Sequence, residues 1–505
     1  MTQYILAHDL GTSGNKATIF SKKGQLIASS VVSYNVTYFN GNWAEQDAND
    51  WWNAVRQSTK ELLLQTKISP KQIKVVCFSG QMMGCLCVDQ NGEPLRKSII
   101  WADQRAQQQA EDLEKSISQK EFYEIVGHRN SPSYGIQKLM WIRDNEADIY
   151  ERTYKMLNAK DYIVFKLTKQ FYTDYTDGNG NGCLDLKNLC WSERILRAAQ
   201  IPEDKLPVLK PSTFIAGGVT EEAAKETGLE IGTPVVLGAG DGLTANIGAG
   251  SVDVGHTYCC LGTSAWISTT SKEPYMDDQM RIFNWVHAVP GYFAPSGTMQ
   301  SAGGSLHWMR RALTNTDEDV AELSFDILYE EMEKSPAGAN GVMFLPYLLG
   351  ERSPRWDAFA KGTFVGLTTE ATKGDLYRSV IEGVSHNLTV ILDVLKEVHP
   401  IEELIVIGGG AKSEFWQQLL ADMFLCKINV PHILDEACSM GAAIIGGVAV
   451  GLYEDFSVID NFLLINRRKQ PNIKMHQIYS REKEKFNTFY EALKPVYQQI
   501  NQLVQ

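Results

Sequence analysis

An acidic residue followed by a small, hydroxyl-rich turn stands near the amino terminus, where Asp9 and Leu10 precede the Gly-Thr-Ser run 11–13. The apolar run before Asp9 predicts a strand, and the turn predicts exposed backbone N–H groups. Such N–H groups can hold an anion, and the carboxylate can hold the cation that accompanies a polyphosphate. Lys16 adds a positive charge one strand away. The alternative is a solvated β-turn with a capping Asp.

The same Leu-Gly-Thr-Ser tetrad occurs a second time, at residues 261–264, again between β-prone stretches. The two copies lie about half a chain apart, which indicates a duplicated module of domain size. If the two turns face each other across a cleft, they can hold one nucleotide between two domains. The second copy therefore favours phosphate binding over a plain turn.

A third segment carries a single acid among small residues, Gly238 to Gly242 with Asp241 at its centre. It follows a predicted strand, and open α/β sheets bind ligands at strand ends. A general base needs such a reachable position, ionised at neutral pH. The alternative is an Asp that caps the following helix.

The fourth segment, Leu404 to Ile407 followed by residues 408–413, is a strand that runs into three glycines and then a helix. It matches neither the dinucleotide-binding pattern, because Ser413 replaces the last Gly, nor the P-loop pattern, because Ala411 precedes the Lys. We expect an adenosine-binding shelf, with a structural turn as the alternative.

A fifth patch combines residues 79–84 (SGQMMG) with residues 101–105 (WADQR). Polar groups beside an indole ring suit a carbohydrate pocket. The alternatives are a core Trp and a plain surface pair of Asp103 with Arg105. His8 is expected to be a packed strand residue rather than a catalyst.

Elements that would position these residues alternate between strands and helices along the chain. Buried strands are predicted at residues 73–78, 234–237 and 404–407, and helices at residues 47–64, 375–395, 414–424 and 480–504. Such alternation predicts an α/β architecture with central sheets. The domain boundary is expected near residues 248–255.

Composition excludes several classes of function. The 505 residues are 44% hydrophobic and 21% charged, as in folded globular proteins, and the net charge of −12 argues against a nucleic-acid-binding protein. The nine cysteines show no metal-ligand spacing, and no secretory signal or membrane-spanning run is recognised. We expect a reduced, cytoplasmic protein without a membrane partner.

Together these segments resemble the FGGY family of carbohydrate kinases over essentially the whole chain. The resemblance rests on DLGTSGNKATIF, FSGQMMG, IIWADQRA, GAGDGLTANIGAG, LGTSAWIS, SAGGSLHWMRR, FLPYLLGERSPRWD and IGGGAKSEFWQQLLADMF, in order. It implies two ribonuclease-H-like α/β domains of the actin, hexokinase and Hsp70 ATPase type with a central cleft. The domains would span residues 1–250 and 251–505.

The resemblance also implies roles for individual residues. ATP, Mg²⁺ and a small sugar would bind in the cleft, and Asp241 would take the proton from the sugar hydroxyl while also contacting the sugar. Asp9 would hold Mg²⁺ through water. The other positions implied are Gly11, Thr12, Ser13, Lys16, Gly262, Thr263, Ser264 and Gly303 for phosphate, Gly409, Gly410 and Ala411 for adenosine, and Gln81, Met82, Met83, Trp101 and Asp103 for the sugar.

Within the family the chain is most similar to the xylulokinase branch, which phosphorylates D-xylulose. Met83 stands where that branch usually has His, and Gly242 where it has Asn. WADQR and GDG are more similar to the gluconokinase branch, so another ketose, a deoxy sugar, a polyol or an aldonate such as gluconate is an alternative acceptor. The resemblance also allows a homodimer.

Two alternatives of other classes use the same fold. A sugar-independent regulatory or chaperone-like ATPase would not need the pocket of Gln81, Trp101 and Asp103. A catalytically inactive sensor would not need Asp9 and Asp241.

Overall fold

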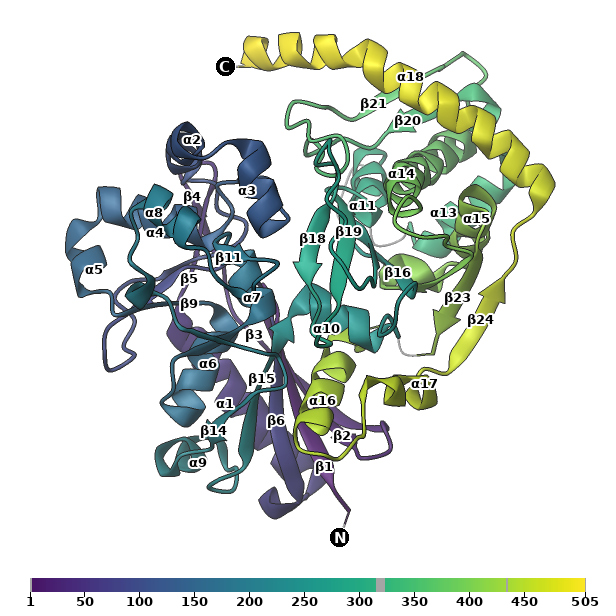
Figure 1. Cartoon of the computed structure of the whole chain (residues 1–505). Helices are drawn as coiled ribbons and strands as arrows, with labels where there is room; N and C mark the ends of the chain where they lie inside the picture. Colours follow the sequence, from purple (N-terminus) through teal and green to yellow (C-terminus); the bar gives the residue numbers. More distant parts are fainter. Residues whose placement is uncertain (1, 315–322, 433–434, 505) are drawn as a thin grey trace.

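Two mixed β-sheets, one from each half of the chain, form the two lobes of the computed structural model (Figure 1). It describes residues 2–314, 323–432 and 435–504. The first sheet has the strand order β3-β2-β1-β6-β15-β14 and the second β18-β19-β17-β16-β22-β23-β24. Their strands are β1 (Tyr4–Leu10), β2 (Gly14–Ser21), β3 (Leu26–Ser33), β6 (Ile73–Gly80), β14 (Ile215–Gly218), β15 (Pro234–Gly240), β16 (Thr257–Leu261), β17 (Ala265–Thr269), β18 (Phe283–Val286), β19 (Phe293–Met299), β22 (Glu403–Ile407), β23 (Lys427–Pro431) and β24 (Ile465–Lys469).

The two sheets repeat one topology. In each, an antiparallel meander (β1-β2-β3 or β16-β17-β19) is continued by two parallel strands (β6 and β15, or β22 and β23) and by one antiparallel edge strand. Both predicted hairpins are present: Leu10 pairs with Asn15 across the first turn, and Leu261 pairs with Ala265 across the second. The predicted duplication and the α/β fold class are confirmed.

Amphipathic helices cover the outer face of each sheet. Helix α1 (Ala48–Thr66) begins at Asp47, whose side chain caps the helix by accepting from the Asn49 N–H, and it packs on β2 and β3. In the second lobe, α14 (Lys373–Leu395) begins with a capping box and packs beside α15 (Glu414–Phe424). These helices match the predicted ones because their apolar residues recur at helical spacing.

Two short, small-residue helices connect the lobes. Helix α10 (Asp241–Gly248) follows β15 of the first sheet, yet its Ala245 packs against Tyr258 of the second sheet. Helix α16 (Ala437–Ala449) comes from the second half of the chain and covers β1 and β6 of the first sheet. Each lobe therefore contributes one helix to the interface between the lobes. Helices α10 and α16 pack against each other there (Figure 1).

The remaining elements are inserted around this duplicated core. The predicted tail helix begins earlier than expected, at Ile473, and runs along the outside of the second lobe (Figure 1). The other helices are α2 (Gln107–Ser116), α3 (Gln119–Val126), α4 (Gly135–Asn145), α5 (Ala147–Arg152), α6 (Ala159–Thr168), α7 (Tyr175–Gly180), α8 (Glu193–Ala199), α9 (Glu221–Thr227), α11 (Gly303–Ala312), α13 (Phe325–Lys334), α17 (Ile459–Phe462) and α18 (Ile473–Val504). The short strands are β4 (Thr37–Phe39), β5 (Trp43–Gln46), β7 (Leu86–Val88), β8 (Ser98–Ile99), β9 (Lys155–Leu157), β10 (Tyr172–Asp174), β11 (Leu184–Asp185), β12 (Cys190–Trp191), β13 (Val208–Lys210), β20 (Met343–Leu345) and β21 (Thr363–Val365).

All nine cysteines are free thiols, and eight of them are buried or partly buried, as expected, while Cys190 is exposed. Within the described ranges, none of the helices combines the length and apolarity that a membrane crossing requires.

Candidate functional site

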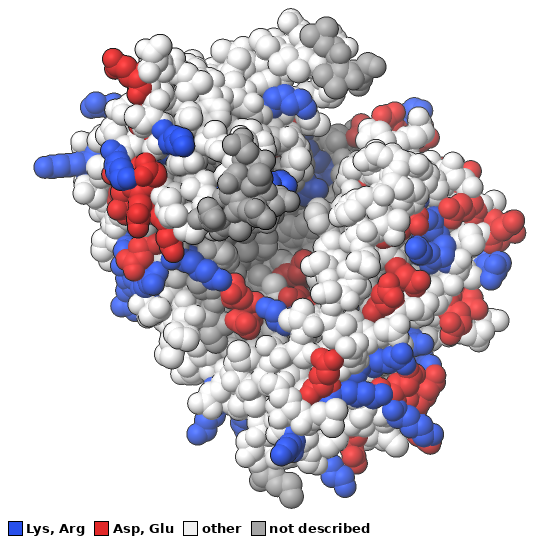
Figure 2. All heavy atoms as spheres, turned by 180° about the vertical axis from the view of Figure 1, so that it is seen from behind, with Lys and Arg blue, Asp and Glu red and all other residues white. Residues whose placement is uncertain are grey.

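Two carboxylates meet at the junction of the lobes, Asp9 near the end of β1 and Asp241 directly after β15. Asp9 accepts a hydrogen bond from the Ser79 hydroxyl at 2.7 Å. The Thr244 hydroxyl lies 2.9 Å from the Ser79 hydroxyl and 2.9 Å from the Asp241 carbonyl oxygen. This chain of polar contacts links the Asp9 carboxylate to the backbone of Asp241 at the start of α10. Figure 2 shows the molecule from behind, where its surface is hollowed between the two lobes.

Asp241 is the first residue of α10, and small residues surround it. Gly240 before it leaves no room for a side chain, because an added Cβ would lie 2.3 Å from the Met82 sulfur. Among the described residues, the neighbour that donates to this carboxylate is the Gly242 N–H, at 2.8 Å, so Asp241 does not cap the helix in the usual way. Burial, together with the negative charge of Asp9, raises the pKa of Asp241 to about 7. From the sequence this acid is expected to be ionised at neutral pH, and the raised pKa brings its titration close to that range.

The first turn, residues 11–13, leaves two backbone donors unused. The Gly11 N–H closes the turn on the Gly14 carbonyl at 3.0 Å. The carbonyls of Gly11 and Thr12 accept from Tyr34 and Gln46 side chains, both at 2.6 Å. In the described part of the chain, the N–H groups of Thr12 and Ser13 have no hydrogen-bond partner. Paired free N–H groups in a tight turn form an anion-binding concavity.

The second turn, residues 262–264, repeats this arrangement. The Gly262 N–H closes it on the Ser264 carbonyl at 3.0 Å, while the N–H groups of Thr263 and Ser264 find no partner among the described residues. Its carbonyls are held by the start of α11, since the Gly303 N–H donates to Gly262 at 2.9 Å. Gly303 therefore supports the turn and has no N–H left for a phosphate, unlike the direct approach expected from the sequence.

Lys16 spans the lobes rather than standing free beside the first turn. Its ammonium donates to the Asp435 carbonyl at 2.8 Å and lies 4.0 Å from the Glu436 carboxylate, just before α16. In this conformation its charge links the first hairpin to the second half of the chain.

The expected adenosine shelf lies beside the second turn. Gly408 has a φ of 91°, and an added Cβ there would approach the Leu261 carbonyl to 2.9 Å. An added Cβ at Gly410 would also clash with Leu261, whereas one at Gly409 would meet open space. Ala411 is 1% exposed and packs in the core of the second lobe. Gly409 and Gly410 can thus border a ligand, but the predicted contact by Ala411 is wrong for this conformation.

The expected sugar residues gather where β6 ends. The Gln81 amide donates to the Gln46 side chain at 2.7 Å, and the half-buried Trp101 donates from its indole N–H to the Thr12 hydroxyl at 2.9 Å. Met83 is partly exposed with a φ of 60°, an uncommon conformation for a residue with a side chain. Met82 is buried in a core cluster against Gly240, so it shapes the floor under Asp241.

Asp103 does not face this pocket. It is fully buried, and its two oxygens accept from the Arg105 guanidinium, with the closest pair at 2.7 Å, and from the Ala44 N–H at 2.6 Å. Arg105 also lies over the Trp43 ring at 3.9 Å. The predicted contact between Asp103 and the sugar is wrong here, as is the alternative of a surface pair, because this is a buried ion pair that fixes the Trp101 segment.

His8 behaves as expected. It is fully buried in β1 between Asn15 and Thr59, and burial lowers its pKa to about 4.

Some residues of the site were not identified from the sequence. Thr244 and Ser79 join the two acids, and Tyr258 donates its hydroxyl to the Gly242 carbonyl while accepting from Trp266. Lys138 was not assigned a role either: it is buried among the apolar residues of helix α4, whose other charged residues, Arg143 and Asp144, are not buried.

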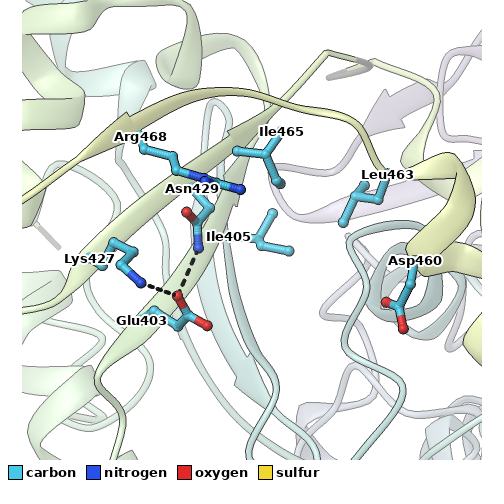
Figure 3. Close-up of a pocket in the computed structure, with 8 residues that line it drawn as sticks. All are labelled: Glu403, Ile405, Lys427, Asn429, Asp460, Leu463, Ile465 and Arg468. Atoms are coloured by element: carbon cyan, nitrogen blue, oxygen red, sulfur yellow. Dashed lines mark hydrogen bonds and ion pairs between the residues drawn. The ribbon is translucent and has the colours of Figure 1, made fainter.

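A separate cavity of about 360 Å³ lies on the open face of β22, β23 and β24, away from the two turns (Figure 3). Within it the Glu403 carboxylate accepts from Lys427 at 3.0 Å and from Asn429 at 3.3 Å. None of the residues predicted to act on a ligand lines this cavity.

Comparison with known proteins identifies the fold and family. Models of the N-terminal and C-terminal domains of the FGGY family of carbohydrate kinases match residues 4–248 and 257–450. A xylulose kinase from Staphylococcus epidermidis is 32% identical, covering 99% of this chain and 98% of its own length. A gluconokinase from Bacillus licheniformis is 31% identical with the same coverage of both chains.

Solved structures agree with this assignment. A gluconate kinase and a ligand-bound xylulose kinase, both from Lactobacillus acidophilus, each superpose with a TM-score of 0.93 at 29% identity, over 99% of this chain and 100% of theirs. The expected two-lobed, ribonuclease-H-like architecture is confirmed. The chain therefore belongs to the FGGY family of carbohydrate kinases and is an ATP-dependent sugar kinase.

Proposed function

We propose that the protein transfers the γ-phosphoryl group of ATP to a hydroxyl of a small sugar, with D-xylulose as the leading acceptor and D-xylulose 5-phosphate as its product. The observation that carries the proposal is the pair Asp9 and Asp241, joined through Ser79 and Thr244 beside two turns with free N–H groups. Phosphoryl transfer depends mainly on positioning and on stabilising charge, which such a site supplies.

In the proposed reaction, the Asp241 carboxylate accepts the proton of the attacking hydroxyl. The hydroxyl oxygen forms a bond to the γ-phosphorus, the bond to the bridging oxygen breaks, and ADP leaves. The N–H groups of Thr12, Ser13, Thr263 and Ser264 bind the phosphate oxygens. Closure of the lobes would exclude water and limit wasteful ATP hydrolysis.

The residues around Asp9 fit a magnesium ion. One Asp9 oxygen accepts from Ser79, and the other has no hydrogen-bond partner within the described residues. Burial raises the pKa of Asp9, and its charge in turn raises that of Asp241, so a cation would relieve both. Mg²⁺ is usually held by one or two carboxylates with waters and phosphate oxygens. When bound, it would neutralise phosphate charge.

Two acceptors are candidates, D-xylulose and D-gluconate. Similar proteins named xylulose kinase favour D-xylulose, and similar proteins named gluconokinase favour D-gluconate as the second candidate. A coupled ADP-release assay over D-xylulose, other pentuloses, deoxy sugars, polyols and D-gluconate tests both. ADP release that no sugar stimulates would instead identify a sugar-independent ATPase.

The side chain of Met83 leads to a testable prediction about the acceptor. A thioether cannot donate a hydrogen bond, so we expect D-xylulose to lack one contact here that a donor side chain would supply. We expect Met83→His to raise kcat/KM for D-xylulose by about tenfold, the scale of one hydrogen bond. His tolerates a positive φ better than most residues. A variant without the gain would contradict this prediction.

The pH dependence of turnover follows from the raised pKa of Asp241. Its carboxyl is protonated below a pKa of about 7 and cannot then act as a base. We expect kcat to fall about tenfold per pH unit on the acid side of this pKa, with the limb displaced to lower pH when a cation is bound. Rates measured at saturating ATP and sugar between pH 5 and pH 8 test this. A kcat that rises from pH 8 towards pH 5 would exclude Asp241 as the base.

We further propose a cytoplasmic location, supported by nine cysteines that form no disulfide. A homodimer is proposed from the family resemblance alone, and sedimentation velocity would test it.

A further inference from the structure

The side chain of Lys138 makes three hydrogen bonds in the interior of the first lobe. Its ammonium donates to the carbonyl oxygens of Met83 at 2.8 Å, Ile100 at 2.8 Å and Ser133 at 2.5 Å. The residue is 0% exposed. An ammonium carries three N–H groups, so every donor of Lys138 is used.

Each of the three carbonyls belongs to a segment that borders the proposed sugar pocket. Met83 is itself in the pocket, and Ile100 directly precedes Trp101, whose indole contacts the Thr12 hydroxyl of the first turn. Ser133 precedes α4 and accepts a hydrogen bond from the Gln104 side chain at 2.7 Å. One side chain therefore sets the spacing of three segments that are separate in sequence.

Among the described residues, the hydrogen-bond partners of this charge are these three carbonyls, and none is a carboxylate. Burial lowers the pKa of Lys138 to about 7, opposed mainly by the charge of Asp103 and assisted by those of Arg105 and Arg352. A buried charge without an ion-pair partner is unfavourable for folding. The neighbouring residues Ile136 and Leu139 already anchor α4 in an apolar core. The ammonium is thus not needed to hold the helix in place.

We propose that Lys138 is a positioning residue for the acceptor, which holds the Met83, Trp101 and Ser133 segments at the separation that the sugar requires. This inference rests on the proposed sugar-kinase function. The nucleotide turn 262–264 and the shelf at Gly410 lie in the other lobe, and the first phosphate turn is reached from this cluster through the single contact of Trp101 with the Thr12 hydroxyl. Loss of Lys138 should therefore act much more on the sugar than on ATP.

The test compares Lys138→Met with wild type, using whichever of D-xylulose and D-gluconate the wild type phosphorylates faster. We expect KM for the sugar to rise by about tenfold or more, since misplacement of about 1 Å can reduce rates by 10². KM for ATP should change less than about twofold. An unchanged sugar KM, or a parallel rise of both KM values, would overturn the proposal. A wild type without sugar-stimulated ADP release would contradict the proposed function instead.

Lys205→Met serves as the matched control. Lys205 also links two backbone carbonyls, of Tyr150 at 3.0 Å and Thr153 at 2.8 Å, but away from the pocket. We expect both of its KM values to stay at the wild-type level. A similar rise of sugar KM in this control would show a general loss of packing and would overturn the assignment to Lys138.

Loss of ADP binding in calorimetry would show that Lys138→Met is unfolded. In that case, hydrogen exchange of the wild type tests the proposal instead. We expect the amides of residues 82–84, 99–101 and 131–134 to gain protection together when the sugar is added. Protection of only one of these segments would overturn the proposal. The same measurement on Lys138→Gln, which keeps two donors, should show a weaker and still concerted gain.

Discussion

Replacing Asp241 by Asn is expected to lower kcat by at least 10²–10⁴-fold, roughly the contribution of a positioned general base, while ATP binding is retained. The reason is that Asn keeps the size of the side chain but cannot accept the proton of the sugar hydroxyl. Single-turnover and steady-state ADP release measure the loss, and calorimetry with ADP measures nucleotide binding.

The same substitution should stabilise the folded protein at alkaline pH. The pKa of Asp241 is raised from 3.8 to about 7 on folding, so its contribution to stability is lost as pH rises through that interval. Asn removes this titration. We expect the melting temperature of Asp241→Asn to exceed that of wild type at pH 8, on the order of a few degrees, and the difference to shrink towards pH 4.

Asp422→Asn is the matched control for both readouts. Asp422 is a buried acid of α15 that accepts from the Asn472 N–H, and its pKa is also raised, mainly by burial. Its loss should leave kcat near the wild-type value. If Asp241→Asn retained near-full turnover, or if the control lost as much activity, the assignment of the base would be wrong.

Gly441→Ala is the second change with a large expected effect. An added Cβ at Gly441 would lie 1.9 Å from the Thr244 carbonyl oxygen, and one at Gly248 of the opposite helix would lie 1.9 Å from the Ala437 carbonyl oxygen. Helices α10 and α16 must therefore separate to admit one methyl group. Because α10 carries Asp241, we expect kcat to fall at least about tenfold and stability to fall by about 1–3 kcal/mol or more.

The sign of the stability change distinguishes a steric clash from an ordinary helix substitution. In an unobstructed helix, Ala in place of Gly stabilises by about 1 kcal/mol. The control is Val448→Ile, which adds a methylene at a half-buried position of the same helix. Thermal unfolding of the two variants compares the stability change at the two sites. A variant that is more stable than wild type and fully active would show that the crossing of α10 and α16 does not position the base.

Local patterns in the sequence predicted the duplicated core. The repeated tetrad at residues 10–13 and 261–264 predicted both hairpins, because glycine and hydroxyl residues between apolar runs determine a turn over a few residues. The acid after β15 was predicted for the same reason. Those features depend on neighbours in sequence.

The features that the sequence did not predict depend on partners far along the chain. Asp103 was expected in the pocket, but Arg105 and the distant Ala44 N–H saturate its carboxylate. Ala411 was expected to border the adenosine, but it packs in the core of the second lobe. The exchange of α10 and α16 between lobes is likewise a tertiary arrangement, since the small residues of both helices do not by themselves indicate which sheet each helix packs against.

The central claim is that the turns at residues 11–13 and 262–264 hold one triphosphate with Asp241 directed at the transferred group. A crystal structure with Mg²⁺, a non-hydrolysable ATP analogue and the preferred sugar tests it most directly. We expect both turns to donate backbone N–H groups to the same nucleotide, and an Asp241 oxygen to lie about 2.6–3.2 Å from a sugar hydroxyl in line with the γ-phosphorus. A nucleotide held by only one turn, or an Asp241 turned away from the acceptor, would contradict the claim.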